Sequence, residues 1–170
     1  MAGSKVIWAR SPGLGAVGGR PARLGSRKKG EPDLKPEKRL AEDRVAFLNG
    51  TYEEAMKLAC EARDYLAYQE PKDRAQLPPR ARMVASCESM RVTARLTQVM
   101  AWLLVQKAVQ AGEISREEAS AEKFRLSAHA VCEQEKPVED QPLPPRLTEL
   151  MQLSLGLYER VARLDAMMDR

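Results

Sequence analysis

The chain is poor in aromatic residues, and its glycines are concentrated at one end. Only two Phe, four Tyr and two Trp occur among 170 residues, and seven of the ten glycines lie within residues 1–30. No stretch alternates apolar and polar side chains over the length of a strand. We therefore expect an all-α fold.

Long apolar runs and a pairable set of cysteines are also missing. The longest strictly apolar run is the seven residues 99–105, whereas a helix needs about 20 to span a bilayer. The three cysteines are odd in number and lie on separate elements, which argues against a disulfide framework and for a reducing compartment. We expect a soluble, cytoplasmic protein with no membrane partner.

Residues suited to catalysis or metal binding are scarce. His129 is the single histidine, and it forms with Cys132 a pair of potential ligands that has no second pair at a zinc spacing. Cys60 and Cys87 lie on apolar helix faces, where cysteine usually serves as a small hydrophobe. One histidine also disfavours histidine-based acid–base or triad catalysis. We expect no enzyme, no catalytic residue, no metal and no cofactor.

The first 43 residues differ from the rest in composition. Of 28 basic and 24 acidic residues, seven basic and no acidic ones lie in 1–30, so the remainder has 21 basic against 24 acidic. A Gly-, Arg- and Pro-rich segment does not bury enough apolar surface to fold. We therefore expect a disordered basic tail at 1–43 and a folded domain at 44–170.

Prolines mark the joints between helices. Outside the tail they fall at 71, at 78–79 and in the group 137–145, between stretches whose apolar residues recur every three or four positions. Capping boxes, in which a hydroxyl and a later carboxylate satisfy free backbone N–H groups, start at Thr51 and Ser115. A glycine inside the last helix, Gly156, suggests that another backbone passes close to it. These signals predict helices at 51–69, 80–111, 115–126 and 145–169.

The predicted helix 80–111 is the central element. It carries two apolar stripes on nearly opposite sides, so it must lie between neighbours. One stripe consists mainly of small or flexible side chains, namely Met83, Cys87, Met90, Ala94, Thr97, Ala101, Leu104 and Ala108. The other is formed by Val92, Leu96, Val99 and Leu103. We expect an antiparallel three-helix bundle with one short extra helix and a disordered N-terminal tail.

Residues 99–105 are apolar on every side of this helix. A helix in a three-helix bundle touches two neighbours and leaves one side to water, so this section needs a further contact. The short helix at 115–126 or a second subunit would supply it. We expect a homodimer that forms through the central helix.

Polar residues share one stripe of the same helix with an indole. We interpret this stripe and its continuation as partner-binding or dimer contacts, since Arg and Trp are favoured interface residues. The candidate residues are Arg91, Arg95, Gln98, Trp102, Val105 and Gln106. Two alternatives stay open: the arginines pair with carboxylates such as Glu88, Glu53, Glu54 or Glu61 and fix the packing, or they bind an anionic substrate.

The segment 88–114, ESMRVTARLTQVMAWLLVQKAVQAGEI, resembles the signature of an alphaproteobacterial family of domains of unknown function, the regulators of CtrA degradation (RcdA-like). The segments EAMKL at 54–58 and EARDY at 61–65 are similar to that family's first helix. The segments EEA at 117–119 and EK at 122–123 resemble the stretch that follows the signature. The resemblance covers about residues 50–126 and fades beyond Ser127.

This resemblance implies a dimerising three-helix bundle with a non-enzymatic function. The family member would be an adaptor or accessory factor that helps the ClpXP protease degrade cell-cycle regulators, notably CtrA, together with other adaptor proteins. Its expected partners are therefore proteins: the protease–adaptor complex, the substrate regulator and a second copy.

Two alternative functions belong to other classes. One is a small helical protein that associates with nucleic acid through the basic tail, although we do not expect nucleic acid as a partner. The other is a small helical enzyme that uses Arg91 and Arg95. A polar cavity beside those arginines would favour the enzyme.

Overall fold

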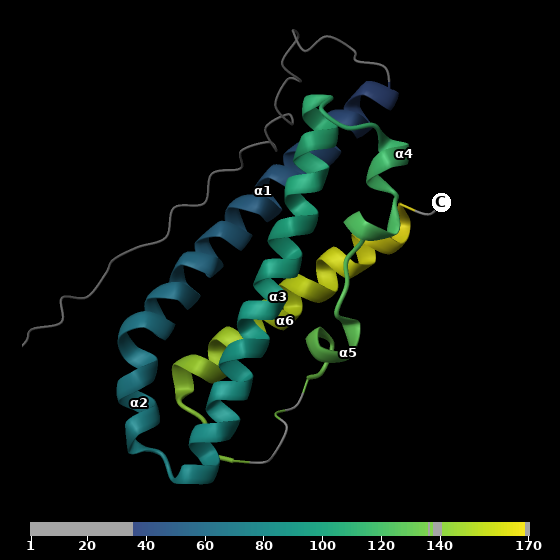
Figure 1. Cartoon of the computed structure of the whole chain (residues 1–170). Helices are drawn as coiled ribbons and strands as arrows, with labels where there is room; N and C mark the ends of the chain where they lie inside the picture. Colours follow the sequence, from purple (N-terminus) through teal and green to yellow (C-terminus); the bar gives the residue numbers. More distant parts are fainter. Residues whose placement is uncertain (1–35, 136, 138–140, 169–170) are drawn as a thin grey trace, which may run out of the picture. The chain divides into compact units, whose positions relative to one another are not determined.

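A computed structural model of the chain describes residues 36–135, 137 and 141–168 (Figure 1). Their regular elements are α1 (Pro36–Asp64), the π-helical turn η1 (Tyr65–Gln69), α2 (Glu70–Gln76), α3 (Pro79–Ala111), α4 (Arg116–Ala119), the 3-10 turn η2 (Glu122–Phe124), α5 (His129–Cys132) and α6 (Pro145–Met167). The expected all-α bundle is confirmed, since the described residues contain helices and no strand. The described residues all belong to one compact unit.

The first helix begins well before the predicted start at Thr51, which is therefore wrong. It begins at Pro36, inside the segment expected to be a disordered tail, while residues 1–35 lie outside the described part of the chain. The Thr51 hydroxyl donates to the Phe47 carbonyl at 2.9 Å, one helical turn back, instead of capping a helix start. Gly50 disfavours helix by only about 1 kcal/mol, which its helix-forming neighbours offset.

The helix also continues beyond its predicted end at Gln69. A π-helical turn accommodates Pro71, which lacks an N–H and whose ring clashes with the carbonyl four residues earlier. In this wider turn the Glu70 N–H donates to the Tyr65 carbonyl, five residues back. The chain therefore stays helical through α2 to Gln76.

The central helix α3 ends in a left-handed cap. Gly112 has φ +73°, a conformation that glycine adopts without strain. The Gly112 N–H donates to Val109 and the Glu113 N–H donates to Ala108, at 3.1 and 2.9 Å, which is the Schellman arrangement. The helix bounds, Pro79–Ala111, lie within a residue of the expected range 80–111.

Helices α1 and α3 run antiparallel side by side (Figure 1). Lys107, near the end of α3, donates to Asn49 of α1 at 3.0 Å. Arg74 of α2 donates to Ser86, near the start of α3, at 3.3 Å. These two contacts fix the two ends of a long helical hairpin.

The direction of α6 differs from the expected antiparallel order with respect to α3. Arg95 donates to the Met151 carbonyl and Trp102 to Asp165, so α6 runs in the same sense as α3 while crossing it obliquely (Figure 1). The connection from 112 to 144 therefore has to return along the bundle. The parallel direction of α3 and α6 is possible because the connection between them is long enough to run from one end of the bundle to the other.

This connection, which we call the crossover, packs against α3. It contains short helical turns where a helix at 115–126 was predicted. The capping box at Ser115 is confirmed, with Ser115 and Glu118 bonded in both directions. Its helix, however, ends at Ala119, and a 3-10 turn and then α5 follow. Ala128 has φ +61°, a left-handed conformation for a residue that carries a Cβ.

The hydrophobic core lies between α1, α3 and α6. Crossover residues Leu126 and Cys132 complete it on one side. Its members include Ala55, Leu58, Ala62 and Tyr65 from the first helix, Val92, Leu96, Val99 and Leu103 from α3, and Leu147, Leu150, Leu157, Tyr158 and Val161 from α6. The α3 stripe containing Val92 and Leu96 therefore faces inward.

Candidate protein-interaction surface

Arg95, one of the predicted contact residues, lies in the interior with 1% of its surface exposed. Its guanidinium donates to the carbonyls of Cys132 at 2.7 Å, Gln134 at 2.6 Å and Met151 at 3.0 Å. Burial lowers the pKa of Arg95 from its ordinary value, and the charge of Arg91 lowers it further. Arg95 thus attaches both the crossover and α6 to α3.

Arg91 is buried one turn earlier on α3. It forms an ion pair with Glu88, which is fully buried, and donates to the Gln134 side chain at 2.9 Å. Pairing of Arg91 with Glu88 was one of the two readings left open for these arginines. Two of the other carboxylates named there have other partners, since Glu54 pairs with Arg160 and Glu61 with Arg146.

Trp102 and Gln98 also contact the chain's own elements. The Trp102 indole donates to the Asp165 carboxylate at 2.7 Å, and Arg125 of the crossover donates to the same oxygen at 2.8 Å. The Gln98 side-chain carbonyl accepts from the Ser127 hydroxyl at 2.9 Å. These contacts hold the crossover over this side of α3.

The last two predicted contact residues lie further along the same helix. Val105 is half-buried and Gln106 is 9% exposed. As partner or dimer contacts the six residues stay a prediction. In the described structure four of them, Arg91, Arg95, Trp102 and Gln106, are buried. The free surface of α3 lies on the side that faces away from the core stripe of Val92, Leu96, Val99 and Leu103.

The outward side of α3 carries no charge over six helical turns. Between Arg82 and Lys107 the helix has three charged residues, Glu88, Arg91 and Arg95, and all three are buried. The exposed residues in this stretch, which we call the outer strip, are Met83, Cys87, Met90, Thr93, Thr97, Ala101 and Leu104. Met83, Met90 and Leu104 are 68%, 72% and 50% exposed. An ordinary surface helix has the reverse arrangement, with charges outward.

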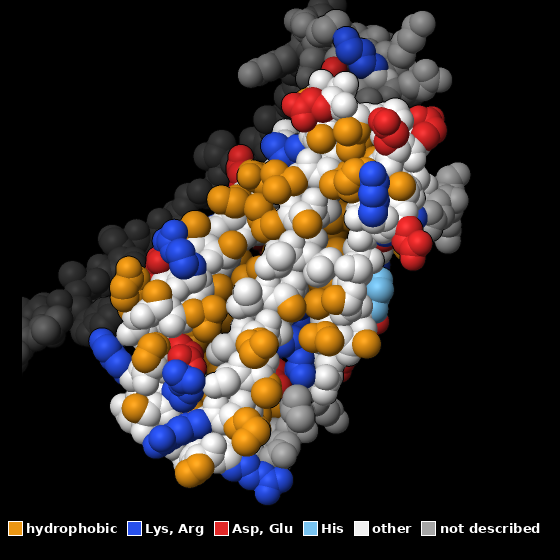
Figure 2. Space-filling model, viewed as in Figure 1, with side chains coloured by type: hydrophobic (Ala, Val, Ile, Leu, Met, Phe, Trp, Pro, Cys, Tyr) orange, Lys and Arg blue, Asp and Glu red, His pale blue; other side chains and the backbone are white. Residues whose placement is uncertain are grey.

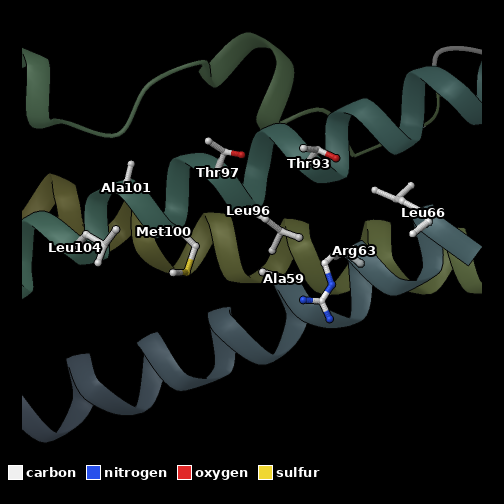
Figure 3. Close-up of a pocket in the computed structure, with 11 residues that line it drawn as sticks. Ala59, Arg63, Leu66, Thr93, Leu96, Thr97, Met100, Ala101 and Leu104 are labelled. Atoms are coloured by element: carbon white, nitrogen blue, oxygen red, sulfur yellow. The ribbon is translucent and has the colours of Figure 1, made fainter.

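An apolar groove adjoins the outer strip, between α1 and α3 (Figure 3). Its volume is about 780 Å³. The side chains of Leu96 and Met100 point from α3 toward α1, where Ala59 and Arg63 lie opposite (Figure 3). The lining residues are Ala59, Ala62, Arg63, Leu66 and Ala67 on one side and Thr93, Leu96, Thr97, Met100, Ala101 and Leu104 on the other.

The outer strip and the groove form one continuous surface, because Thr93, Thr97, Ala101 and Leu104 belong to both. Arg63 is the one charged residue lining the groove, and it bonds to its neighbour Asp64. Contiguous exposed apolar surface of this kind marks binding sites for other proteins. The sequence signal for it was the stripe of small and flexible residues from Met83 to Ala108.

Groups of three or more potential metal-ligating side chains do not occur among the described residues. His129 instead contacts Glu133 through Nδ1 at 2.8 Å and the Leu126 carbonyl through Nε2 at 3.1 Å. Cys132 is fully buried, and burial raises the pKa of its thiol. Both residues thus belong to the packing of the crossover.

Among the described helices, none is both long enough and apolar enough to cross a membrane. In the apolar section 99–105 three residues, Val99, Trp102 and Leu103, are buried. Two others, Ala101 and Leu104, are exposed. The crossover and α6 therefore cover one side of this section. The other side belongs to the outer strip.

The comparisons with known proteins agree on one family. A family model described as a protein of unknown function (DUF1465) matches residues 40–170. The crystal structure of RcdA from Caulobacter crescentus CB15 is similar to the chain, with a TM-score of 0.59 and 40% sequence identity. The match covers 71% of this chain and 89% of that one. No curated protein matches the chain.

Proposed function

The chain belongs to the RcdA-like family described by the DUF1465 model, and on this premise we propose that it is a non-enzymatic accessory factor in regulated proteolysis. It acts in the cytoplasm and helps the ClpXP protease degrade a cell-cycle regulator such as CtrA. Its partners are the protease with its other adaptors and the substrate regulator. It uses no metal or cofactor.

The observation that carries this proposal is the distribution of charge on α3. Glu88, Arg91 and Arg95 are used inside the bundle, while the outer strip offers only neutral and apolar side chains. An enzyme that bound an anion through Arg91 and Arg95 would need those groups in a polar cavity. Here Arg95 is directed at three backbone carbonyls of its own chain.

An adaptor with such a surface works by holding two partners together. Several weak contacts raise the effective concentration of a substrate at the unfoldase without any chemical step. The groove between α1 and α3 supplies apolar contact area for one such partner. Flexible methionines, here Met83, Met90 and Met100, suit surfaces that bind more than one protein.

A second copy of the chain is the occupant that we propose for the outer strip. Thr93, Thr97 and Ala101 are small and follow one another at helical spacing, so two α3 helices can approach closely. A symmetric dimer requires a self-complementary patch, which an uncharged strip provides because no like charges meet across it. The homodimer would thus form on the side of α3 opposite to Arg95 and Trp102.

The test of the function is a reconstituted degradation reaction. It contains ClpXP, its primed adaptors and a candidate regulator such as CtrA, with and without this chain. We expect faster turnover of the regulator when the chain is present, and loss of the effect when Thr97→Arg and Leu104→Glu disrupt the outer strip. Unchanged turnover across several regulators would refute the proposal.

A further inference from the structure

The end of the helical hairpin formed by α2 and the first turn of α3, residues 70–83, has a mainly basic surface. We call this region the hairpin tip. Four basic residues are exposed there, Lys72, Arg74, Arg80 and Arg82. Of its two acidic residues, Glu70 is 8% exposed and Asp73 is half-buried. Figure 2 shows Lys and Arg side chains gathered at this end, with hydrophobic side chains between them.

The two acidic residues of the hairpin tip interact with other residues of the same chain. Glu70 pairs with Arg74 at 3.1 Å. Asp73 lies beside Tyr65, and burial of that phenol, together with the charge of Asp73, raises the pKa of Tyr65. The negative charges are therefore used in packing, while the positive ones remain at the surface.

The tip is held rigid by its own arginines. Arg82 donates to the carbonyls of Leu77 at 2.7 Å and Ala75 at 3.0 Å, which satisfies carbonyls at the end of α2. Arg74 donates to Ser86 at 3.3 Å across the turn. Binding at a preorganised surface loses less conformational entropy than binding at a mobile loop.

Large side chains near the basic residues are exposed to solvent. Tyr68, in the π-helical turn that precedes α2, is 70% exposed, and Met83 at the other edge of the tip is 68% exposed. Tyrosine and methionine beside arginine are typical of protein-binding surfaces. Tyr68 has no role in the core, so its exposure favours contact with another molecule.

We propose that the hairpin tip binds an acidic segment of a partner protein, one that carries apolar side chains between its carboxylates. Lys72 and the guanidinium edges attract the carboxylates, and Tyr68 contacts the apolar side chains. A protein segment fits better than nucleic acid, since Tyr68 is exposed beside the basic residues and supplies an apolar contact that binding to a phosphate backbone does not use. The inference rests on the proposed function only in taking the partner to be a protein.

The experiment measures binding of a fluorescein-labelled, Glu-rich peptide with interspersed Leu to the full chain, by fluorescence anisotropy at low and at physiological salt. The double variant Lys72→Glu with Tyr68→Ala tests the tip. The control is Lys57→Glu, which makes the same charge change at an exposed position of α1 outside the tip. A peptide with Gln in place of Glu and an oligothymidylate of equal length serve as competing probes.

We expect the tip variant to bind the acidic peptide at least about tenfold more weakly, and the control variant to change affinity by less than about twofold. Binding should also weaken as salt rises, because the contact is electrostatic. Equal effects of the two variants, preference for the Gln peptide or the oligonucleotide, or no binding of the acidic peptide would overturn the proposal. The degradation assay is a separate readout, so either proposal can fail while the other stands.

Discussion

Trp102 and Asp165 are joined by a hydrogen bond of 2.7 Å from the indole nitrogen to the carboxylate, which ties α3 to the last turns of α6. Arg125 of the crossover donates to the same carboxylate oxygen at 2.8 Å and to the Asp165 carbonyl at 3.0 Å. Three segments that are distant in the sequence therefore meet at one buried carboxylate. Their meeting explains why Trp102 is only 4% exposed.

Removing this carboxylate should destabilise the bundle. Asp165→Ala leaves the buried indole N–H without its acceptor and removes the carboxylate that Arg125 contacts, so we expect a loss of about 2–4 kcal/mol in the free energy of unfolding. Urea denaturation followed by circular dichroism measures it. Glu149→Ala, which removes an exposed partner of Arg146, should cost less than about 1 kcal/mol. Similar losses for both variants would contradict a special role of Asp165.

Arg95 is expected to act as a clamp on the crossover. Arg95→Lys keeps the charge but cannot reach three carbonyls with the planar geometry of a guanidinium. We expect a loss of about 1–3 kcal/mol and faster amide hydrogen exchange around Cys132 and Gln134 than elsewhere in the chain. Exchange that rises equally throughout the bundle would show that Arg95 supports global stability only.

The sequence predicted the helices whose ends are marked by strong local signals. Pro79 and Gly112 bound α3 because one residue lacks an N–H and the other adopts positive φ, and both effects act locally. The start of the first helix was predicted wrongly. The Thr51 capping box is a local signal for a helix start, but the chain before Thr51 is already helical. Packing of residues such as Leu48 against the core stabilises the longer helix.

Which face of α3 is exposed could not be read from residue types alone. Arg91, Arg95 and Trp102 were predicted at the surface because these residues are frequent in interfaces. Their burial depends on a crossover that passes over them, and the order of α3, crossover and α6 is a long-range property. The small and flexible stripe, by contrast, was visible in the sequence, and it is this stripe that is exposed.

The glycines inside and at the end of helices should respond oppositely to alanine. Gly156 was expected to lie against another backbone, but a Cβ there would meet nothing within 4 Å, so that expectation is wrong for the described residues. Gly156→Ala should raise the free energy of unfolding by up to about 1 kcal/mol. Gly112→Ala, at φ +73°, should lower it by about 1 kcal/mol. Thermal denaturation of the two variants checks the signs.

A charge in the middle of the outer strip should separate the proposed dimer. Thr97→Arg places a cation where two copies of α3 would pack, and an unpaired buried charge costs several kcal/mol. We expect wild type to sediment as a dimer at concentrations on the order of tens of micromolar and this variant as a monomer. Gln152→Arg, an equal change at an exposed site of α6, should leave the dimer intact. A monomeric wild type would refute the dimer.

The three cysteines offer a test of burial that needs no substitution. Cys60 and Cys87 are exposed, whereas Cys132 is fully buried and burial raises the pKa of its thiol. Because the thiolate is the reactive form, a thiol reagent should label Cys60 and Cys87 in the folded chain and Cys132 only after unfolding. Mass spectrometry of labelled peptides distinguishes the three.

The same labelling reports on the outer strip, because Cys87 belongs to it and Cys60 lies on α1 outside the groove lining. If a second copy covers the strip, the labelling rate of Cys87 should fall relative to that of Cys60 as the protein concentration rises. In Thr97→Arg the ratio of the two rates should no longer depend on concentration. A constant ratio in the wild type, together with a dimer by sedimentation, would place the dimer contact elsewhere on the bundle and leave the outer strip free for another protein.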